Sequence, residues 1–286
     1  MSAARLIDRV VTIINPLKYD SEAIRREACE YFQARGVQYV SAAYNSAPQP
    51  QLFEGTDLAL SFGGDGTLLY CARLLAGKDI PILAVNLGDF GFITEISRNE
   101  WIDAFEKFAA GKLGISHRMM LQVSVRRGGV EDCHFLGLND AVIGSTGISR
   151  IIRLNVFLAD VAVGRYRADG VIVATPTGST AYSMAAGGPI VHPEMEAFVL
   201  NPICPFTLSN RPLVIPGHEV LQIEVEEKQR TDAILTVDGQ EAYPLQPRDR
   251  VIFSRAQAKS LIIRSDKRDF YRVLGAKLNW GGQPNA

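Results

Sequence analysis

The first part of the chain alternates between two hydrophobic periods. Short apolar runs rich in β-branched residues, which are typical of buried strands, alternate with segments whose apolar positions recur at helical spacing. The pattern predicts strands over Val10–Ile14, Val37–Ala43, Asp57–Phe62 and Ile82–Val85, with helices over Ser21–Arg35 and Thr67–Leu75. Ser21 is the expected N-cap of the first helix and Gly36 the glycine that ends it. Strands and helices in alternation indicate parallel strands with right-handed crossovers, and therefore a Rossmann-like open α/β sheet.

From about residue 115 the pattern changes to short β-rich runs separated by turns that Gly or Pro marks. These runs predict strands at Leu121–Arg126, Ile151–Leu158, Val171–Ala174, Leu213–Ile215, Leu221–Val225, Ala233–Val237, Val251–Ser254 and Leu261–Arg264. Such a succession is typical of a β-sandwich or of mixed sheets. Helical spacing returns over Asp266–Leu278. We therefore expect an α/β nucleotide-binding domain of residues 1–114, to which residues 266–286 return as a C-terminal helix, and a β-rich, sandwich-like domain of residues 115–265.

Composition narrows the function classes. The 286 residues are 47% hydrophobic and 21% charged, which provides a sizeable core and excludes a disordered chain or a coiled coil. A formal net charge of −1 argues against a protein that mainly binds nucleic acid or a membrane surface. The four cysteines are widely spaced, which argues against a disulfide framework or a zinc site. Without a long apolar stretch for a membrane span or a signal peptide, we expect a cytoplasmic protein.

A glycine-rich turn, Gly63-Gly64-Asp65-Gly66-Thr67, joins a predicted strand to a predicted helix. That junction lies at the carboxyl edge of an open parallel sheet, where ligands bind. Glycines let a ligand approach the backbone, and the N–H groups that begin the next helix suit phosphate. The turn is neither a Walker A loop, since no Gly-Lys-Ser/Thr follows, nor a dinucleotide fingerprint, since Leu69 replaces its third glycine.

Asp65 is the unusual member of this turn. A carboxylate repels phosphate, so its presence indicates catalysis or metal binding, although Asp65 could also be an ordinary turn residue that caps the helix at Thr67. A second glycine turn, Asn86–Phe92, follows the next predicted strand. Two adjacent glycine-rich strand ends are expected to line one crevice.

A second candidate site lies in the segment Asp169–Pro189, where an apolar strand leads into Thr-Pro-Thr-Gly-Ser-Thr and a short helix-forming stretch. Ser179 or Thr180 would cap that helix and offer hydroxyls to a polar ligand, although the same composition suits a plain turn. Tyr182 could stack on a base or donate a hydrogen bond. The pair Asn139-Asp140 could grip ribose hydroxyls or form a common turn, and Arg150 and Arg167 are candidate phosphate binders.

Together, in this order and at this spacing, the motifs resemble those of bacterial NAD kinases from Leu58 to about Gln240. Lipid kinases of the diacylglycerol and sphingosine type share Gly63–Thr67, whereas the segment from Thr175 to Ser183 is much more specific. The resemblance implies transfer of the γ-phosphoryl group of ATP to the 2′-hydroxyl of the adenosine ribose of NAD, giving NADP and ADP. It also implies Mg²⁺ that arrives with ATP instead of a metal site in the protein, and homodimers or homotetramers in which a neighbouring subunit completes the site.

The resemblance also assigns roles to single residues. Asp65 would accept the hydroxyl proton and, with Gly66, contact NAD. Asn139 and Asp140 would hold the dinucleotide, with a shorter reach at Asp140 than the glutamate of many relatives. Gly63, Gly64, Thr67 and Asn86 would lie on the side of the nucleotide triphosphate. Further NAD contacts would come from Arg150, Arg167, Asp169, Thr177, Thr180, Ala181, Tyr182, Ser183, Met184, Ala185 and Gln240.

Two alternatives remain. A lipid kinase with the same glycine turn would need an apolar, membrane-facing entrance, and the sequence has no basic amphipathic helix to build one. A dinucleotide sensor without catalysis would keep Asn139, Asp140 and Thr180–Ser183 but would not need Asp65.

Overall fold

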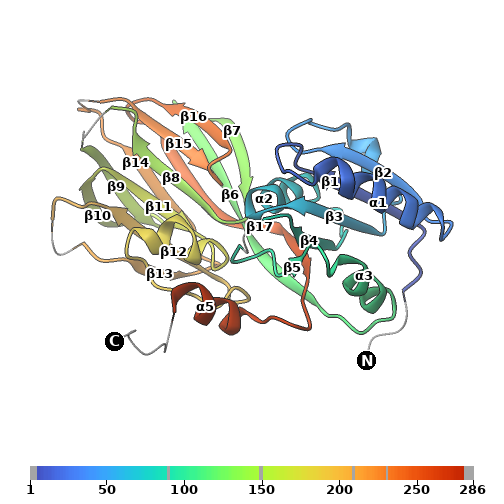
Figure 1. Cartoon of the computed structure of the whole chain (residues 1–286). Helices are drawn as coiled ribbons and strands as arrows, with labels where there is room; N and C mark the ends of the chain where they lie inside the picture. The colour runs from blue at the N-terminus through green and yellow to red at the C-terminus, as the bar shows by residue number, and fades with distance from the viewer. Residues whose placement is uncertain (1–4, 89–90, 148–150, 208–209, 230, 280–286) are drawn as a thin grey trace. The chain divides into compact units, whose positions relative to one another are not determined.

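The computed structural model describes residues 5–88, 91–147, 151–207, 210–229 and 231–279. The chain divides into unit 1, Met1–His117 with Ser260–Ala286, and unit 2, Arg118–Lys259. It passes from one unit to the other within two long strands, β6 (Ile115–Arg127) and β17 (Arg250–Ile263) (Figure 1). The expected domain boundaries at residues 114 and 266 lie a few residues from these crossing points.

Unit 1 is an open α/β sheet. Its parallel strands follow the order β2 (Gln38–Ala43), β1 (Arg9–Ile14), β3 (Leu58–Gly63) and β4 (Ile82–Asn86). Both β5 (Ile96–Ser97) and the end of β17 pair with β4 in parallel. A 3₁₀ helix, η1 (Pro50–Phe53), lies between β2 and β3. The predicted fold of this part is confirmed.

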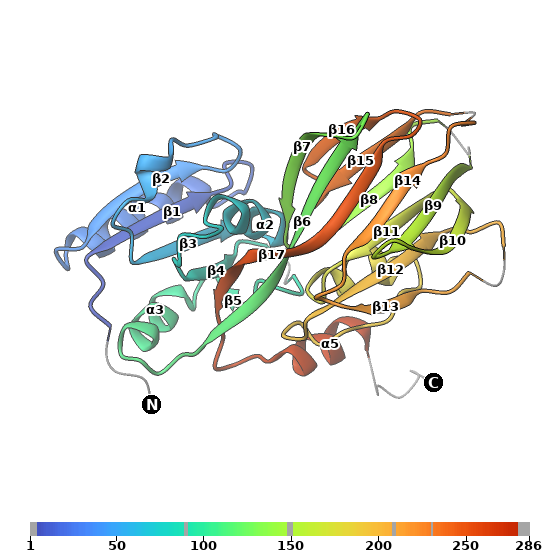
Figure 2. The same ribbon diagram turned by 180° about the vertical axis from the view of Figure 1, so that it is seen from behind.

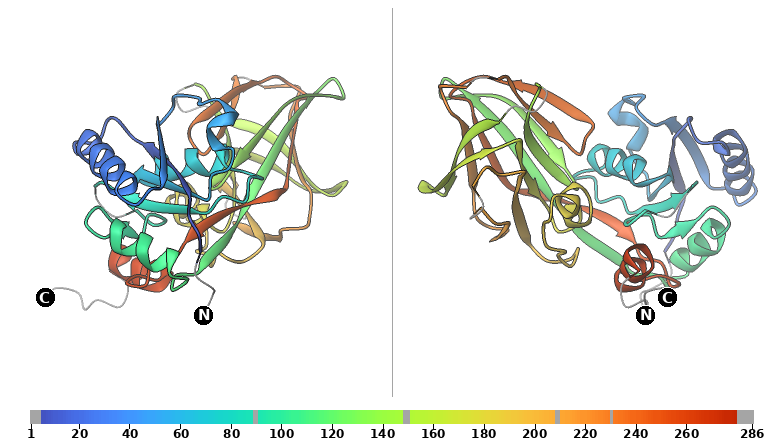
Figure 3. Two further views of the ribbon diagram at one scale, coloured as in Figure 1. Left: turned by 90° about the vertical axis from the view of Figure 1, so that its right-hand side faces the viewer. Right: turned by 60° about the vertical axis from the view of Figure 1, so that its left-hand side comes forward.

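Helices cover both faces of this sheet. α1 (Ser21–Gln33) and α3 (Trp101–Ala109) lie on one face, and α2 (Asp65–Leu74) lies on the other (Figure 3). Between the sheet and the helices α1 and α3, the fully buried rings of Phe32, Phe62 and Trp101 pack together. Because β1 and β3 are neighbours whose helices cover opposite faces, the sheet has a topological switch point at their carboxyl ends.

The ends of α1 and α2 and the place of the C-terminal helix bear on four local predictions. Ser21 is not an N-cap: it is the first residue of α1, Asp20 takes the cap position, and the Ser21 hydroxyl donates to the Pro16 carbonyl at 3.3 Å. Gly36 follows α1 with φ +71°, as expected of a terminating glycine. α2 begins two residues before Thr67, so Asp65 is the first residue of the helix and does not cap it. The C-terminal helix α5 (Phe270–Leu278) belongs to unit 1, which confirms its predicted return.

Unit 2 is a sandwich of two sheets (Figure 2). In the first, β10 (Val161–Ala168), β9 (Ile152–Leu158), β14 (Leu221–Val225) and β17 are neighbours in this order, and β6 pairs with both β17 and β7 (Val130–Gly137). The second is antiparallel, in the order β13 (Leu213–Pro216), β12 (Ala197–Ile203), β11 (Gly170–Ala174), β8 (Asp140–Ser145), β15 (Ala233–Val237) and β16 (Glu241–Leu245).

The inner faces of these two sheets share one hydrophobic core. Leu154 and Phe253 enter it from the first sheet, and Ile143 and Phe198 from the second. All four side chains are at most 1% exposed. The sandwich-like prediction is confirmed. None of the helices within the described ranges has the length and hydrophobicity that a membrane crossing requires.

Candidate active site

The first glycine turn lies at the switch point of the unit 1 sheet. β3 ends at Gly63, and α2 starts at Asp65. A Cβ on Gly63 would come within 2.0 Å of Thr67 Oγ1, so this position requires glycine. The turn after β1 is tied to the same place, because the Asn15 N–H donates to the Phe62 carbonyl at 2.9 Å. Gly64 faces open space, since a Cβ there would meet nothing within 4 Å, and a ligand can approach the backbone at this point.

The second glycine turn holds the Asp65 carboxylate. Oδ2 accepts the N–H of Phe92 at 2.9 Å. Oδ1 accepts the N–H of Thr94 at 3.1 Å and the Thr94 hydroxyl at 2.9 Å. The two glycine-rich turns therefore meet, and the crevice that they are expected to line stays a prediction. Asp65 is half-buried, and these donors fix the direction in which its carboxylate points.

Asn86 hydrogen-bonds to the second glycine turn and to Thr94, which follows it. It is 3% exposed, and its Nδ2 donates to the Thr94 hydroxyl at 2.9 Å. Its Oδ1 accepts the N–H of Gly88 at 2.7 Å. The amide of Asn86 thus braces the second turn and, through Thr94, orients Asp65.

In unit 2, one aspartate organises the turn that carries Asn139 and Asp140. The Asp238 carboxylate accepts the N–H groups of Leu138 at 2.9 Å, Asn139 at 2.8 Å and Asp140 at 3.2 Å. Its own N–H donates to the Asp140 carbonyl at 2.8 Å. Asp238 was not among the predicted residues. The signal was available in Asp238-Gly239, which directly follows the run Ala233–Val237, because Asp-Gly marks a tight turn.

Two buried side-chain oxygens of this turn and of the loop that packs on it have no hydrogen-bond partner, Asn139 Oδ1 and Thr177 Oγ1, and farther along the same loop Ser183 Oγ has none either. The loop that carries Thr177 lies directly on the turn, because a Cβ on Gly178 would come within 2.0 Å of the Asn139 carbonyl oxygen. Thr175 joins the same two segments, since its N–H donates to that carbonyl at 2.8 Å. Burying a polar atom without a partner costs about 1–3 kcal/mol. Such atoms therefore mark positions where a polar ligand would restore hydrogen bonds.

The predicted helix caps in this loop are wrong. A 3₁₀ turn, η2 (Gly178–Thr180), precedes the short helix α4 (Tyr182–Ala185), and no side chain caps α4. The turn directs both hydroxyls back into the loop: Ser179 Oγ donates to the Pro176 carbonyl at 2.7 Å, and Thr180 Oγ1 donates to the Thr177 carbonyl at 3.3 Å. The outer surface of this segment comes from Ala181, Tyr182, Met184 and Ala185, of which Tyr182 is 48% exposed.

Asp140 is a buried acid at the start of β8. Burial, and secondarily the negative charge of Asp238, raise the pKa of Asp140 to about 7. A carboxyl group with this pKa is present in both protonation states near neutral pH, so it can donate or accept a hydrogen bond. Gln240, half-buried, follows in the turn after Asp238, and its N–H donates to the Val237 carbonyl at 2.9 Å.

Arg167 and Asp169 do not lie beside the turn that carries Asn139 and Asp140. Asp140 pairs with Ala174 at one end of the β8–β11 ladder, and Asp169 precedes Gly170 at the other end. At about 3.3 Å per residue, four residues of strand separate the two ends by roughly 13 Å. Arg167 is exposed on β10, where its guanidinium lies 4.7 Å from the ring centroid of Phe206. Arg150 lies outside the described residues.

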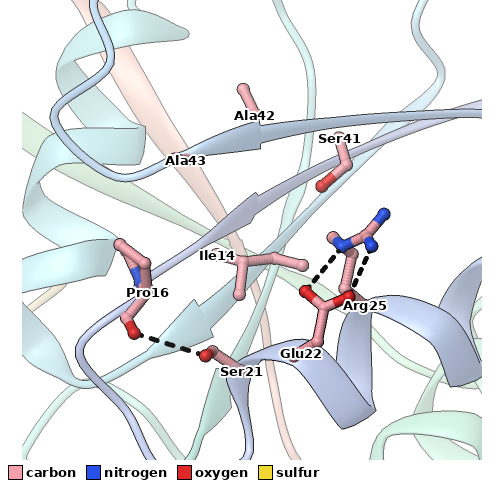
Figure 4. Close-up of a pocket in the computed structure, with 8 residues that line it drawn as sticks. All are labelled: Ile14, Pro16, Ser21, Glu22, Arg25, Ser41, Ala42 and Ala43. Atoms are coloured by element: carbon pink, nitrogen blue, oxygen red, sulfur yellow. Dashed lines mark hydrogen bonds and ion pairs between the residues drawn. The ribbon is translucent and has the colours of Figure 1, made fainter.

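Unit 1 also contains a cavity of about 300 Å³ that was not predicted (Figure 4). It lies at the carboxyl ends of β1 and β2. Arg25 in its wall donates to the Glu22 carboxylate at 3.0 and 2.6 Å, so this guanidinium is already paired. The cavity is lined by Ile14, Pro16, Ser21, Glu22, Arg25, Ser41, Ala42 and Ala43. Across the described part of the chain, no group of three or more His, Cys, Asp or Glu side chains is arranged to hold a metal ion.

Comparison with known proteins identifies the family. The family model for the ATP-NAD kinase N-terminal domain matches residues 5–113, and that for the ATP-NAD kinase C-terminal domain matches residues 138–265. The NAD kinase of Treponema denticola is 40% identical over 275 residues, which cover 96% of this chain and 97% of the relative. That of Geobacter sulfurreducens is 43% identical over 225 residues, 79% of each chain.

Solved structures agree in fold. An NAD kinase from Archaeoglobus fulgidus in complex with ATP has a TM-score of 0.74 and 26% identity, covering 95% of this chain and 98% of the other. Yeast NADH kinase complexed with NADH has a TM-score of 0.85 and 23% identity, covering 98% of this chain and 90% of the other, a likeness of fold alone. With both family models matched in chain order and full-length relatives at this identity, the chain belongs to the ATP-NAD kinase family.

Proposed function

We propose that the protein transfers the γ-phosphoryl group of ATP to the 2′-hydroxyl of the adenosine ribose of NAD, giving NADP and ADP, and that it does so in the cytoplasm. The observation that carries this proposal is the Asp65 carboxylate, which begins α2 on a glycine turn and is oriented by N–H groups of a second glycine turn. The names of the relatives support it, as do structural neighbours that bind ATP in one case and NADH in the other.

Asp65 is the proposed general base. Phosphoryl transfer passes through a loose transition state, so positioning and neutralisation of charge supply most of the catalysis. The carboxylate then needs only to accept the hydroxyl proton, late in the reaction and from a fixed direction. Backbone N–H groups of the turn Gly63–Thr67 suit the phosphate oxygens of ATP, and Mg²⁺ carried by ATP would offset the repulsion between those oxygens and Asp65.

The dinucleotide is assigned to the unit 2 residues that present unpartnered polar atoms. Asn139, Thr177 and Ser183 offer buried oxygens that accept, and in two cases also donate, hydrogen bonds to ribose and amide groups. Asp140 adds a carboxyl group beside them. Further contacts are proposed for Gly66, Thr180, Ala181, Tyr182, Met184, Ala185 and Gln240. Because the hydroxyl of Thr180 points into the loop, Thr180 would contact the dinucleotide through its backbone.

Arg167 and Asp169 are proposed to act on the dinucleotide of a neighbouring subunit in a homodimer or homotetramer. This accounts for the place of Asp169 at the far end of the β8–β11 ladder from Asn139, and for the exposed position of Arg167 on β10. If it is so, a mixture of Asp169→Ala and Asn139→Ala chains, unfolded and refolded together, recovers activity that neither variant has alone. Mixtures that stay as inactive as the separate variants would place both residues on one subunit's ligand.

The reaction is tested with purified protein, ATP, Mg²⁺ and NAD, with any NADP formed coupled to an NADP-specific dehydrogenase. Signal that requires all three components supports the proposal. Folded protein that binds NAD in calorimetry but gives no signal would favour a sensor. Protein that neither binds nor phosphorylates NAD but phosphorylates diacylglycerol would favour a lipid kinase.

A further inference from the structure

The segment that orients Asp65 is itself held by the C-terminal part of unit 1. The donors to Asp65 come from residues 92–94, and the chain continues through Glu95 into β5. Ser265, just after β17, donates its N–H to the Glu95 carboxylate at 3.2 Å. At the other end of the segment, Lys277 of α5 lies 5.9 Å from the ring centroid of Phe92. Both ends of the segment are therefore in contact with residues 265–277.

Arg268 makes the central contacts of this region. Its Nη1 donates to the Glu95 carbonyl at 3.0 Å and to Glu100 Oε2 at 2.7 Å, and its Nη2 donates to Glu100 Oε1 at 3.2 Å. Glu100 in turn accepts the N–H of Ser97 at 3.0 Å and Lys267 Nζ at 3.2 Å. One guanidinium thus fixes the backbone directly after the donors to Asp65 and, through Glu100, the residue that ends β5.

Partial burial strengthens the ion pair between Arg268 and Glu100. The side chains of Arg268 and Glu100 are only 28% and 18% exposed. The Arg268 hydrogen bonds hold the pKa of Glu100 well below its usual range, so Glu100 is charged throughout the working pH range. A two-bond contact between guanidinium and carboxylate is directional as well as strong, and partial burial limits screening by salt.

Arg268 and α5 lie outside the two ranges that the family models match, whereas Glu95 and Glu100 lie inside the first. The two family models match residues 5–113 and 138–265, so Arg268 and α5 follow the end of the second. Within unit 1, however, they meet the segment that faces Asp65.

We propose that Arg268 is a positioning residue for phosphoryl transfer. By fixing Glu95 and Glu100 it keeps the N–H groups of Phe92 and Thr94 directed at the Asp65 carboxylate, and so keeps that carboxylate aimed at the acceptor hydroxyl. The catalytic part of this inference rests on the proposed role of Asp65, whereas the mechanical part does not. Loss of Arg268 should release residues 92–97, lower kcat and leave the affinity for NAD nearly unchanged, because the proposed contacts to the dinucleotide, apart from Gly66, lie in unit 2.

The test combines amide hydrogen exchange with kinetics on the full-length chain. In Arg268→Gln, exchange in peptides covering residues 92–97 is expected to accelerate about tenfold, kcat to fall about tenfold, and KM for NAD to change by less than about twofold. Arg268→Lys, which keeps the charge but not the two-bond contact, should be intermediate in both exchange and kcat. Arg272→Gln is the matched control, since Arg272 lies on α5 with its side chain 74% exposed, and it should behave as the wild type.

Unchanged exchange in Arg268→Gln would overturn the proposal, and so would accelerated exchange with unchanged kcat. A loss of kcat accompanied by an equal rise in KM and faster exchange throughout unit 1 would show a general loss of structure and would also overturn it. The proposed function is tested separately: if Asp65→Asn retains full turnover, Asp65 is not the base, while the exchange of residues 92–97 still decides whether Arg268 holds the segment.

Discussion

Gly91 leaves the space that the Asp65 carboxylate occupies. A Cβ on Gly91 would come within 1.9 Å of Asp65 Oδ1, far closer than any real contact. The glycine is thus required because another residue's carboxylate fills the position of its missing side chain. The adjacent Phe92 then supplies its N–H to the same carboxylate at 2.9 Å. A close approach and a hydrogen bond from neighbouring residues together fix Asp65.

Gly91→Ala is expected to displace Asp65 and reduce kcat by about 100-fold, the usual contribution of a positioned general base. The comparison is Gly64→Ala, where an added methyl group meets nothing within 4 Å. Gly64→Ala should keep the wild-type melting temperature and raise KM for ATP, because its methyl group obstructs the approach of a phosphate. Steady-state kinetics and thermal unfolding of both variants measure these effects, and equal kcat values in the two would contradict the proposed role of Gly91.

Asp65→Asn is expected to bind NAD within about threefold of the wild type and to lose at least about 100-fold in kcat. Part of any loss could come from the changed hydrogen bonds instead of the missing base. Asp57→Asn controls for this, since Asp57 Oδ2 also accepts two backbone N–H groups, from Asp8 at 2.8 Å and Arg9 at 2.9 Å. Calorimetric NAD titration and coupled turnover of both variants separate the effects. Similar turnover losses in the two would remove Asp65 from the base role.

Two threonines of one loop should respond in opposite ways to valine. Thr177 Oγ1 is buried without a partner, whereas Thr175 Oγ1 donates to the Leu138 carbonyl at 2.6 Å. Thr177→Val removes an unsatisfied group, so the ligand-free protein should keep or gain stability while NAD binds about tenfold more weakly. Thr175→Val should lower the free energy of unfolding by about 1–3 kcal/mol, because it leaves buried backbone groups unpaired. Chemical denaturation and NAD titration measure both, and a Thr177→Val protein with undiminished NAD affinity would show that this hydroxyl does not contact the dinucleotide.

The raised pKa of Asp140 makes stability depend on pH with a definite sign. The folded state holds this proton up to about pH 7, whereas the unfolded chain releases it near pH 3.8. Because the folded state binds the proton more tightly, the free energy of unfolding falls as the pH rises from about 4 to 7. Asp140→Asn removes this dependence. Its ligand-free form should melt about 7 °C above the wild type at pH 8, and the two proteins should coincide near pH 4. A difference in melting temperature that is the same at both pH values would contradict the assignment.

The sequence allowed most of the strands with continuous or alternating apolar residues to be predicted, because burial dictates their composition, but β12 was missed although Ala197–Leu200 is continuously apolar and buried. Edge strands such as β7 and β10 were not predicted, since half or more of their residues are exposed and the strands carry little hydrophobic signal. Two predicted strands proved to be one: between Phe253 and Leu261, small residues alternate with long polar ones, and this continues β17. α3 was missed although Trp101, Ala104, Phe105 and Phe108 have helical spacing.

For the candidate site, the sequence indicated the residue types and the adjacency of the two glycine turns. It did not indicate what holds them. Asp238 and Arg268 act on segments that lie far away in the chain, and only the folded backbone brings those N–H and carbonyl groups within reach. The inward hydroxyls of Ser179 and Thr180 were mistaken for caps because composition does not distinguish a 3₁₀ turn from the first turn of an α-helix. The chemical roles of the individual site residues stay predictions until the variants above are measured.

Unit 1 is built from two separate stretches of the chain, and this affects when the enzyme can become active during synthesis. Ribosomes make the chain from residue 1 onward, and compact regions begin to fold as they emerge. Both glycine turns and the whole of unit 2 are translated before Ser260, yet the partners of Glu95 and Glu100 belong to residues 265–268. A nascent chain that has not reached Arg268 already carries Asp65 and every proposed NAD contact, but lacks the residues that steady the segment facing Asp65. Translation order would therefore delay full activity until residues 265–268 have been made.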